Sequence, residues 1–318
     1  MVFWEMILVG NYLLASVGFI ANIFYWKLVV FNSSFDGYSR IASFIIASAT
    51  TLLIVSNVIS TSVCLSYGSY FNSGPCLENG LYILMVVLHS YGECSIVAGL
   101  FILAFERYAS VFFPTFRLSG SYKLWFSFII LLYLVFLCTY LYMMNVEKSV
   151  FAILFSTVSA SILYLTSFLL VIYLFCAAKR RYYETLGIIP LTQRYMISES
   201  YELCRSTLPA TISSLAINIV LFISFWMLLF DIIPQTKGNE YFVLANMTLN
   251  VTATLFPILF IIGSRKIRRK FVKINPFNHQ QVESKEDQNF EVRQLNGNRI
   301  NFTQTQNEYF EQLQSSWS

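Results

Sequence analysis

Seven long apolar stretches leave few folds open to this sequence. A helix needs about 20 apolar residues to cross the hydrocarbon core of a membrane, and each stretch is close to that length or above it. The stretches are too uniformly apolar for the strands of a membrane barrel, in which apolar and polar residues alternate. The sequence therefore predicts an all-α membrane protein, a bundle of seven transmembrane helices. The expected spans are residues 7–30, 41–65, 81–105, 124–144, 150–178, 207–230 and 241–263.

The low proportion of charged residues supports this assignment. Only 12% of the 318 residues are charged, whereas a soluble protein carries roughly 25%. Glu5 stands where a signal peptide would carry basic residues, and the first apolar stretch is longer than the apolar core of such a peptide. We therefore expect this stretch to be retained as the first helix.

Basic residues are distributed unevenly between the predicted loops. Lys and Arg concentrate on the cytoplasmic side of membrane-spanning proteins. With the N-terminus outside, the external loops contain only Lys148 and Lys237, and nearly all other basic residues fall on the opposite side. This asymmetry predicts an external N-terminus and, after seven spans, a cytoplasmic C-terminus.

The segment after the last span changes composition twice. Residues 264–274 are basic with interleaved apolar residues, which indicates either an amphipathic helix on anionic membrane lipids or a plain stop-transfer flank. Residues 275–318 are rich in Asn, Gln and Glu, so we expect a disordered cytoplasmic tail. The predicted organisation is a membrane domain, 1–263, followed by the juxtamembrane helix and the tail.

Motifs for soluble catalysis are absent from the sequence. It contains no phosphate-binding glycine loop, no zinc-ligand spacing and no nucleophile elbow. The basic residues flank spans and form no nucleic-acid-binding module. We expect neither an enzyme nor a nucleic-acid-binding protein, and no cofactor or metal.

The third apolar stretch carries the most ionisable groups. His89 and Glu93 are four residues apart on one face of this span, and an ionisable residue inside a membrane indicates a functional site. They either contact a ligand in the outer half of the bundle or form a mutually satisfied pair that fixes helix packing. The stretch ends in Glu106, Arg107 and Tyr108.

Three residues of the last two spans are further candidates for a ligand pocket. Asn246 and Asn250 share a face of the seventh span, where polar side chains commonly bridge helices. Trp226 belongs to the outer part of the sixth span, where an aromatic side chain lines a pocket or anchors the helix at the lipid interface. For all three, packing is the more common role.

An acidic residue, an arginine and a tyrosine at the end of the third of seven spans resemble the corresponding triplet of rhodopsin-like G-protein-coupled receptors. Residues 191–195, LTQRY, and 197–200, ISES, lie before the sixth span. They are similar to the LSxRYQxxEN stretch of nematode serpentine chemoreceptors. That stretch belongs to the Sra superfamily, above all class epsilon (Sre).

The resemblance implies a receptor that binds an external small chemical and activates a heterotrimeric G protein. Arg107 would be the switch: it holds an acid of a neighbouring helix at rest and engages the G protein when released. Glu199 or Glu202 would supply that acid, and Glu106 would be a side partner, because adjacent helix residues diverge. The resemblance also implies the plasma membrane of a sensory neuron, including its cilium, and an arrestin-like regulator of the tail.

The sequence also departs from rhodopsin-like receptors. These tie the outer end of the third span to the second external loop by a disulfide, but residues 145–149 contain no cysteine. Cys64 then remains as the external partner of Cys76. The proline of the seventh span, Pro257, lacks the asparagine and tyrosine that flank it in those receptors.

Other seven-span proteins remain as alternatives. A retinal protein needs a lysine in the seventh span, and residues 241–263 contain none. A small transporter would show internal repeats, and none is visible. A ligand-gated channel of the insect odorant type would have the inverted topology, which the distribution of basic residues opposes.

Overall fold

The computed structural model describes residues 2–31, 36–69, 74–147, 149–184, 191–230, 232, 238–264 and 267–268. The chain divides into two units, Met1–Val272 and Lys273–Ser318. The second unit, with the predicted tail, lies outside the described residues, and so does most of the predicted juxtamembrane helix.

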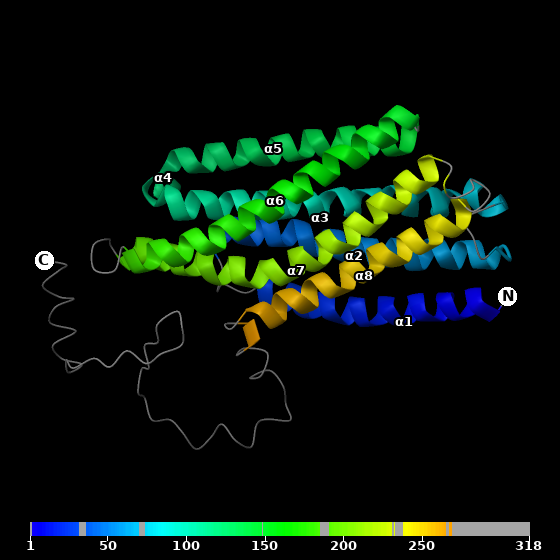
Figure 1. Ribbon diagram of the computed structural model, residues 1–318, viewed down its shortest axis with the longest axis horizontal. Helices are drawn as coiled ribbons and strands as arrows, with labels where there is room; N and C mark the ends of the chain where they lie inside the picture. The colour runs from blue at the N-terminus through cyan, green and yellow to red at the C-terminus, as the bar shows by residue number, and fades with distance from the viewer. Residues whose placement is uncertain are drawn as a thin grey trace, which may run out of the picture. The chain divides into compact units, whose positions relative to one another are not determined.

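All regular structure in these ranges is helical (Figure 1). The elements are α1 (Val2–Tyr25), η1 (Trp26–Val30), α2 (Gly37–Ser66), η2 (Gly74–Glu78), α3 (Gly80–Phe112), α4 (Pro114–Leu118), α5 (Gly120–Tyr142), η3 (Met143–Glu147), α6 (Val150–Glu184), α7 (Leu191–Leu229) and α8 (Gly238–Gly263). Within the described residues, seven helical segments are long and apolar enough to cross a membrane. The predicted seven-helix fold is therefore confirmed.

Helix α3 lies at the centre of the bundle, in contact with α2, α5, α6 and α7. It approaches α2 closely through Gly92 and Gly99, because a Cβ atom at either position would meet α2 side chains within 3 Å. The spans α2 and α3 are the most buried, whereas α1, α5 and α6 carry many exposed apolar side chains. These exposed faces suit contact with lipid, since a helix in hydrocarbon needs no polar outer surface.

A disulfide bonds the connection between α2 and α3 to the last turn of α2. Cys64, in the last turn of α2, is bonded to Cys76 of η2, and their Cα atoms are 5.1 Å apart. Tyr82 of α3 packs against this pair. The disulfide therefore links η2, which directly precedes α3, to the end of α2.

Several helices extend beyond the apolar stretches. Residues between the fifth and sixth predicted spans are also helical, because α6 continues to Glu184 and α7 begins at Leu191. Pro209 lies inside α7. Hydropathy locates only the part of a helix that matches the membrane core, so it did not predict that α7 begins well before its apolar stretch.

Candidate functional site

Two buried ionic residues lie one to two turns before the end of α3. Glu106 and Arg107 are each 1% exposed, and the turn around them faces α2 and α7. Tyr108 points to another side, where its ring lies near those of Phe105 and Phe112. The triplet is thus divided between an interior ionic site and an aromatic surface.

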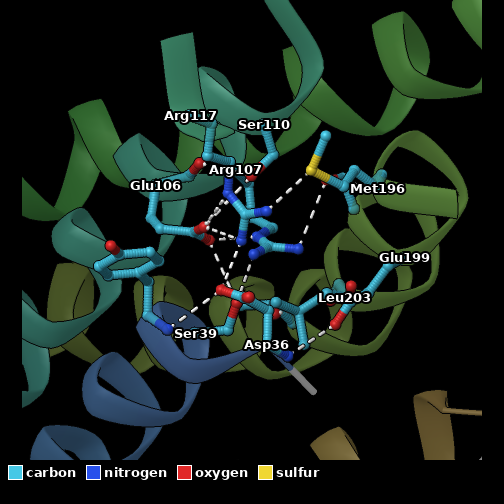
Figure 2. Close-up of polar contacts among 12 residues, drawn as sticks. Asp36, Ser39, Glu106, Arg107, Ser110, Arg117, Met196, Glu199 and Leu203 are labelled. Carbon is cyan, nitrogen blue, oxygen red and sulfur yellow. Dashed lines mark hydrogen bonds and ion pairs between the residues drawn. The ribbon is translucent and has the colours of Figure 1, made fainter. Parts of the chain in front are cut away.

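Glu106 is the acceptor at the centre of this site (Figure 2). Its Oε1 accepts hydrogen bonds from Nε and Nη2 of Arg117 at 2.9 and 2.8 Å and from the Ser110 hydroxyl at 3.1 Å. Its Oε2 accepts from the Ser39 hydroxyl at 3.2 Å and from Nε of Arg107. Hydroxyl groups and cations from three helices therefore converge on one carboxylate.

Arg107 joins α3 to two other helices. Its Nε donates to Glu106, its Nη2 donates to Ser39 of α2, and its Nη1 lies 3.5 Å from the Ser200 hydroxyl of α7. The direct contact with Glu106 corrects the expectation of a side partner. Adjacent side chains leave a helix in different directions, but the long arginine side chain bends back to the neighbouring carboxylate.

Arg117 enters the site from α4. Pro114 begins this short helix, a position that proline favours because its missing N–H is not needed there. Besides Glu106, Arg117 binds Asp36 through Nη2 and Met196 of α7 through Nη1, 3.0 Å from the sulfur atom. Asp36 also caps α2 by accepting a hydrogen bond from the backbone N–H of Tyr38 at 3.0 Å.

One face of α7 closes the site. Met196 accepts from Arg117, Ser200 lies against Arg107, and Glu199 accepts a hydrogen bond from the backbone N–H of Asp36 at 2.9 Å. These residues are three and four positions apart, so they share a face of the helix. Neither Glu199 nor Glu202 forms the predicted ion pair with Arg107, and Oε2 of Glu202 has no hydrogen-bond partner.

Opposite charges meet directly at this site. Two carboxylates, Glu106 and Asp36, face two guanidinium groups, Arg107 and Arg117. Attraction between such groups is strong where water is excluded, and removing one partner of a buried pair typically costs about 3–5 kcal/mol. Each group therefore depends on the others, and a change in one contact alters the stability of the rest.

The predicted ligand residues of α3 are separate from each other. His89 lies 3.4 Å from the Ser56 hydroxyl of α2 through Nδ1, and its Nε2 is buried without a hydrogen-bond partner. Glu93 accepts a hydrogen bond from the Tyr140 hydroxyl of α5 at 3.3 Å. They do not form the mutually satisfied pair that was one interpretation of the sequence, since each faces a different helix.

Asparagine side chains join α1, α2 and α8. Asn250 donates to Asn11 at 2.8 Å, Asn11 donates to Asn57 at 3.0 Å, and Asn57 donates to the backbone oxygen of Asn246 at 3.1 Å. A cavity of about 20 Å³ beside them is lined by Asn11, Asn57 and Asn246. This volume is enough for a water molecule but not for an organic ligand.

Trp226 of α7 stands apart from these groups. Its ring lies near those of Phe222 and Phe230, and its Nε1 is buried without a hydrogen-bond partner. The five predicted pocket residues therefore do not form one cluster: Asn246 and Asn250 belong to the asparagine network, while His89, Glu93 and Trp226 have other neighbours. Among the residues described, no group of three His, Cys, Asp or Glu side chains could hold a metal ion.

Sequence reasoning missed half of the ionic site. Arg117 was interpreted only as a basic flank of a span, and Asp36 and Ser39 were not singled out. Two signals were present: Pro114 marks the first position of a new helix, and Asp36 before an apolar stretch is a typical helix cap. Both predict helix starts, but neither predicts that the two ends meet.

Comparison with known proteins identifies the family of this chain. The family model described as Sre G protein-coupled chemoreceptor matches residues 77–318, which include α3 and the spans after it, with Glu106, Arg107 and Arg117 of the ionic site. A search of curated proteins gives no match. Because the family model covers more than half of the sequence, the chain belongs to the Sre family of G protein-coupled chemoreceptors.

Proposed function

We propose that this multi-pass membrane receptor binds an external small chemical and activates a heterotrimeric G protein on the cytoplasmic side. The N-terminus lies outside and the C-terminus inside, which places the ionic site at the cytoplasmic ends of the helices. Family membership supports the chemosensory role. The distribution of Lys and Arg in the sequence supports the orientation.

The observation that carries this proposal is the placement of Arg107. This guanidinium is buried between α3, α2 and α7, and it contacts both Glu106 and the α7 hydroxyl of Ser200. We take this arrangement as the resting state. Movement of α7 away from α3 would release Arg107 toward the G protein, and a ligand that binds the open arrangement better would increase its population.

Ligand contact is assigned to the outer part of α3. His89 supports this because its buried Nε2 lacks a hydrogen-bond partner and is available to a polar ligand. Glu93, four residues further along the helix, would hold a cationic or hydrogen-bonding group. Asn246, Asn250 and Trp226 are better explained as packing residues, given their contacts with neighbouring residues.

The test is nucleotide exchange on a G protein. Membranes that contain the receptor and a heterotrimeric G protein would be assayed without ligand and with a panel of volatile and water-soluble small chemicals. We expect Arg107→Ala to abolish receptor-dependent exchange at normal surface level. Arg180→Ala, which removes an arginine with an 80% exposed side chain on α6, should exchange like the unchanged receptor. Full exchange by Arg107→Ala would remove Arg107 as the switch.

A further inference from the structure

The two arginines of the ionic site use different oxygens of one carboxylate. Arg117 donates to Oε1 of Glu106 through two nitrogens, at 2.9 and 2.8 Å, while Arg107 donates to Oε2. Ser110 also donates to Oε1, at 3.1 Å, and Ser39 donates to Oε2, at 3.2 Å. Each oxygen therefore has its own cation and its own hydroxyl group (Figure 2).

The arginines differ in their dependence on α7. Arg107 contacts the α7 hydroxyl of Ser200, whereas the α7 contact of Arg117 is with the thioether of Met196, and a thioether is a weak acceptor. The other bonds of Arg117 go to Glu106 and to Asp36, outside α7. Displacement of α7 would thus leave Arg117 in place with both carboxylates.

We propose that Arg117 is a positioning residue that keeps Glu106 neutralised while Arg107 leaves the site. This inference rests on the proposed switch role of Arg107. The Glu106 side chain has no exposed surface. If Arg107 were its only cation, the departure of Arg107 would leave an unpaired buried carboxylate, which is strongly unfavourable. With Arg117 on the other oxygen, Arg107 departs from a carboxylate that remains paired.

A double-mutant cycle, measured by the Tm of the receptor in detergent, tests whether both arginines neutralise Glu106, and it needs no G protein. Arg107→Gln and Arg117→Gln would be made singly and together. Each single variant retains one cation at Glu106, while the double variant retains none. We expect the loss of Tm in the double variant to exceed the sum of the single losses by about 5 °C or more.

Two controls separate charge sharing from general damage. Glu106→Gln should remove the excess loss, or restore accumulation where the double variant fails to fold, because no buried carboxylate then needs a cation. Arg180→Gln combined with Arg107→Gln should give additive losses, since Arg180 pairs with Glu184 at the exposed surface of α6. Additive losses for Arg107→Gln and Arg117→Gln, or an excess that persists with Glu106→Gln, would overturn the proposal.

The second measurement is basal nucleotide exchange in membranes, normalised to surface receptor. Arg117→Gln should lower exchange roughly tenfold, because releasing Arg107 would expose an unpaired charge. Adding Glu106→Gln should restore exchange to the level of the unchanged receptor or above it. A rise in exchange with Arg117→Gln would instead make Arg117 part of the resting lock and overturn its role.

The two measurements also separate this inference from the proposed function. If the unchanged receptor promotes no exchange on any G protein, the proposed function fails. The double-mutant cycle in Tm still decides whether Arg117 neutralises Glu106 together with Arg107. If exchange occurs and depends on Arg107 but not on Arg117, the proposed function stands and this inference fails.

Discussion

The hydroxyl group of Ser39 forms hydrogen bonds with two charged side chains. Its hydroxyl donates to Glu106 and accepts from Arg107, and the residue is fully buried. Hydrogen bonds to charged groups contribute about 1.5–3 kcal/mol each. We therefore expect Ser39→Ala to lower the free energy of unfolding by about 2 kcal/mol, measured as thermal or denaturant unfolding in detergent.

Ser48 provides the matched control on the same helix. Its hydroxyl donates to the backbone oxygen of Ile45, within α2, so Ser48→Ala removes a local bond and should change stability by less than about 0.5 kcal/mol. Equal effects of the two substitutions would show that Ser39 contributes no more than an ordinary helix hydroxyl.

At this scale the sequence singled out Glu106 and Arg107, with Glu106 only as a side partner, and it did not single out Arg117. Glu106 and Arg107 could be found because their order and their position at the end of an apolar stretch form a local pattern. Arg117 could not, because its role depends on where a five-residue helix places it against the beginning of α2. A basic residue after a span has the same sequence pattern whether it lies in water or in a buried site.

Contact between α2 and α3 depends on a glycine. A Cβ atom at Gly92 would lie 2.9 Å from the backbone oxygen of Ala49 and 2.7 Å from Cγ of Leu53. The backbone of α2 cannot yield without moving the whole helix, and overpacking of this kind costs about 1–3 kcal/mol. We expect Gly92→Ala to lower the Tm of the receptor despite the better helix propensity of alanine.

Gly80 provides a control that distinguishes the effect of helix packing on Tm from the effect of helix propensity. It begins the same helix, and a Cβ atom there meets nothing within 4 Å. Gly80→Ala should therefore leave the Tm unchanged or raise it slightly. A Tm that does not fall with Gly92→Ala would contradict close contact between the helices at this position.

The number of helices was predictable at the scale of elements, but their ends were not. Each apolar stretch matches a helix because a membrane span must satisfy its backbone hydrogen bonds internally. The additional turns of α6 and α7 carry charged residues, such as Arg181 and Glu199, that hydropathy assigns to loops. These turns nevertheless matter most for the site, since Glu199 and Ser200 contact it from α7.

The orientation of the whole molecule is a prediction that follows from charge. With the N-terminus outside, almost all basic loop residues lie on the cytoplasmic side, where the ionic site and the proposed G-protein surface must also be. We expect an epitope tag placed after Ser318 to be labelled only in permeabilised cells. A tag placed before Met1 should be labelled in intact cells.

Glycosylation gives an internal check on the same receptor. Asn301 begins the acceptor motif Asn301-Phe302-Thr303, and this motif is modified only when it is exposed on the lumenal or external side. We expect Asn301 to remain unmodified. Labelling of the C-terminal tag in intact cells, or sugar on Asn301, would place Arg107 outside the cell. A G protein could not reach it there, and a channel of inverted topology would then become the function to test.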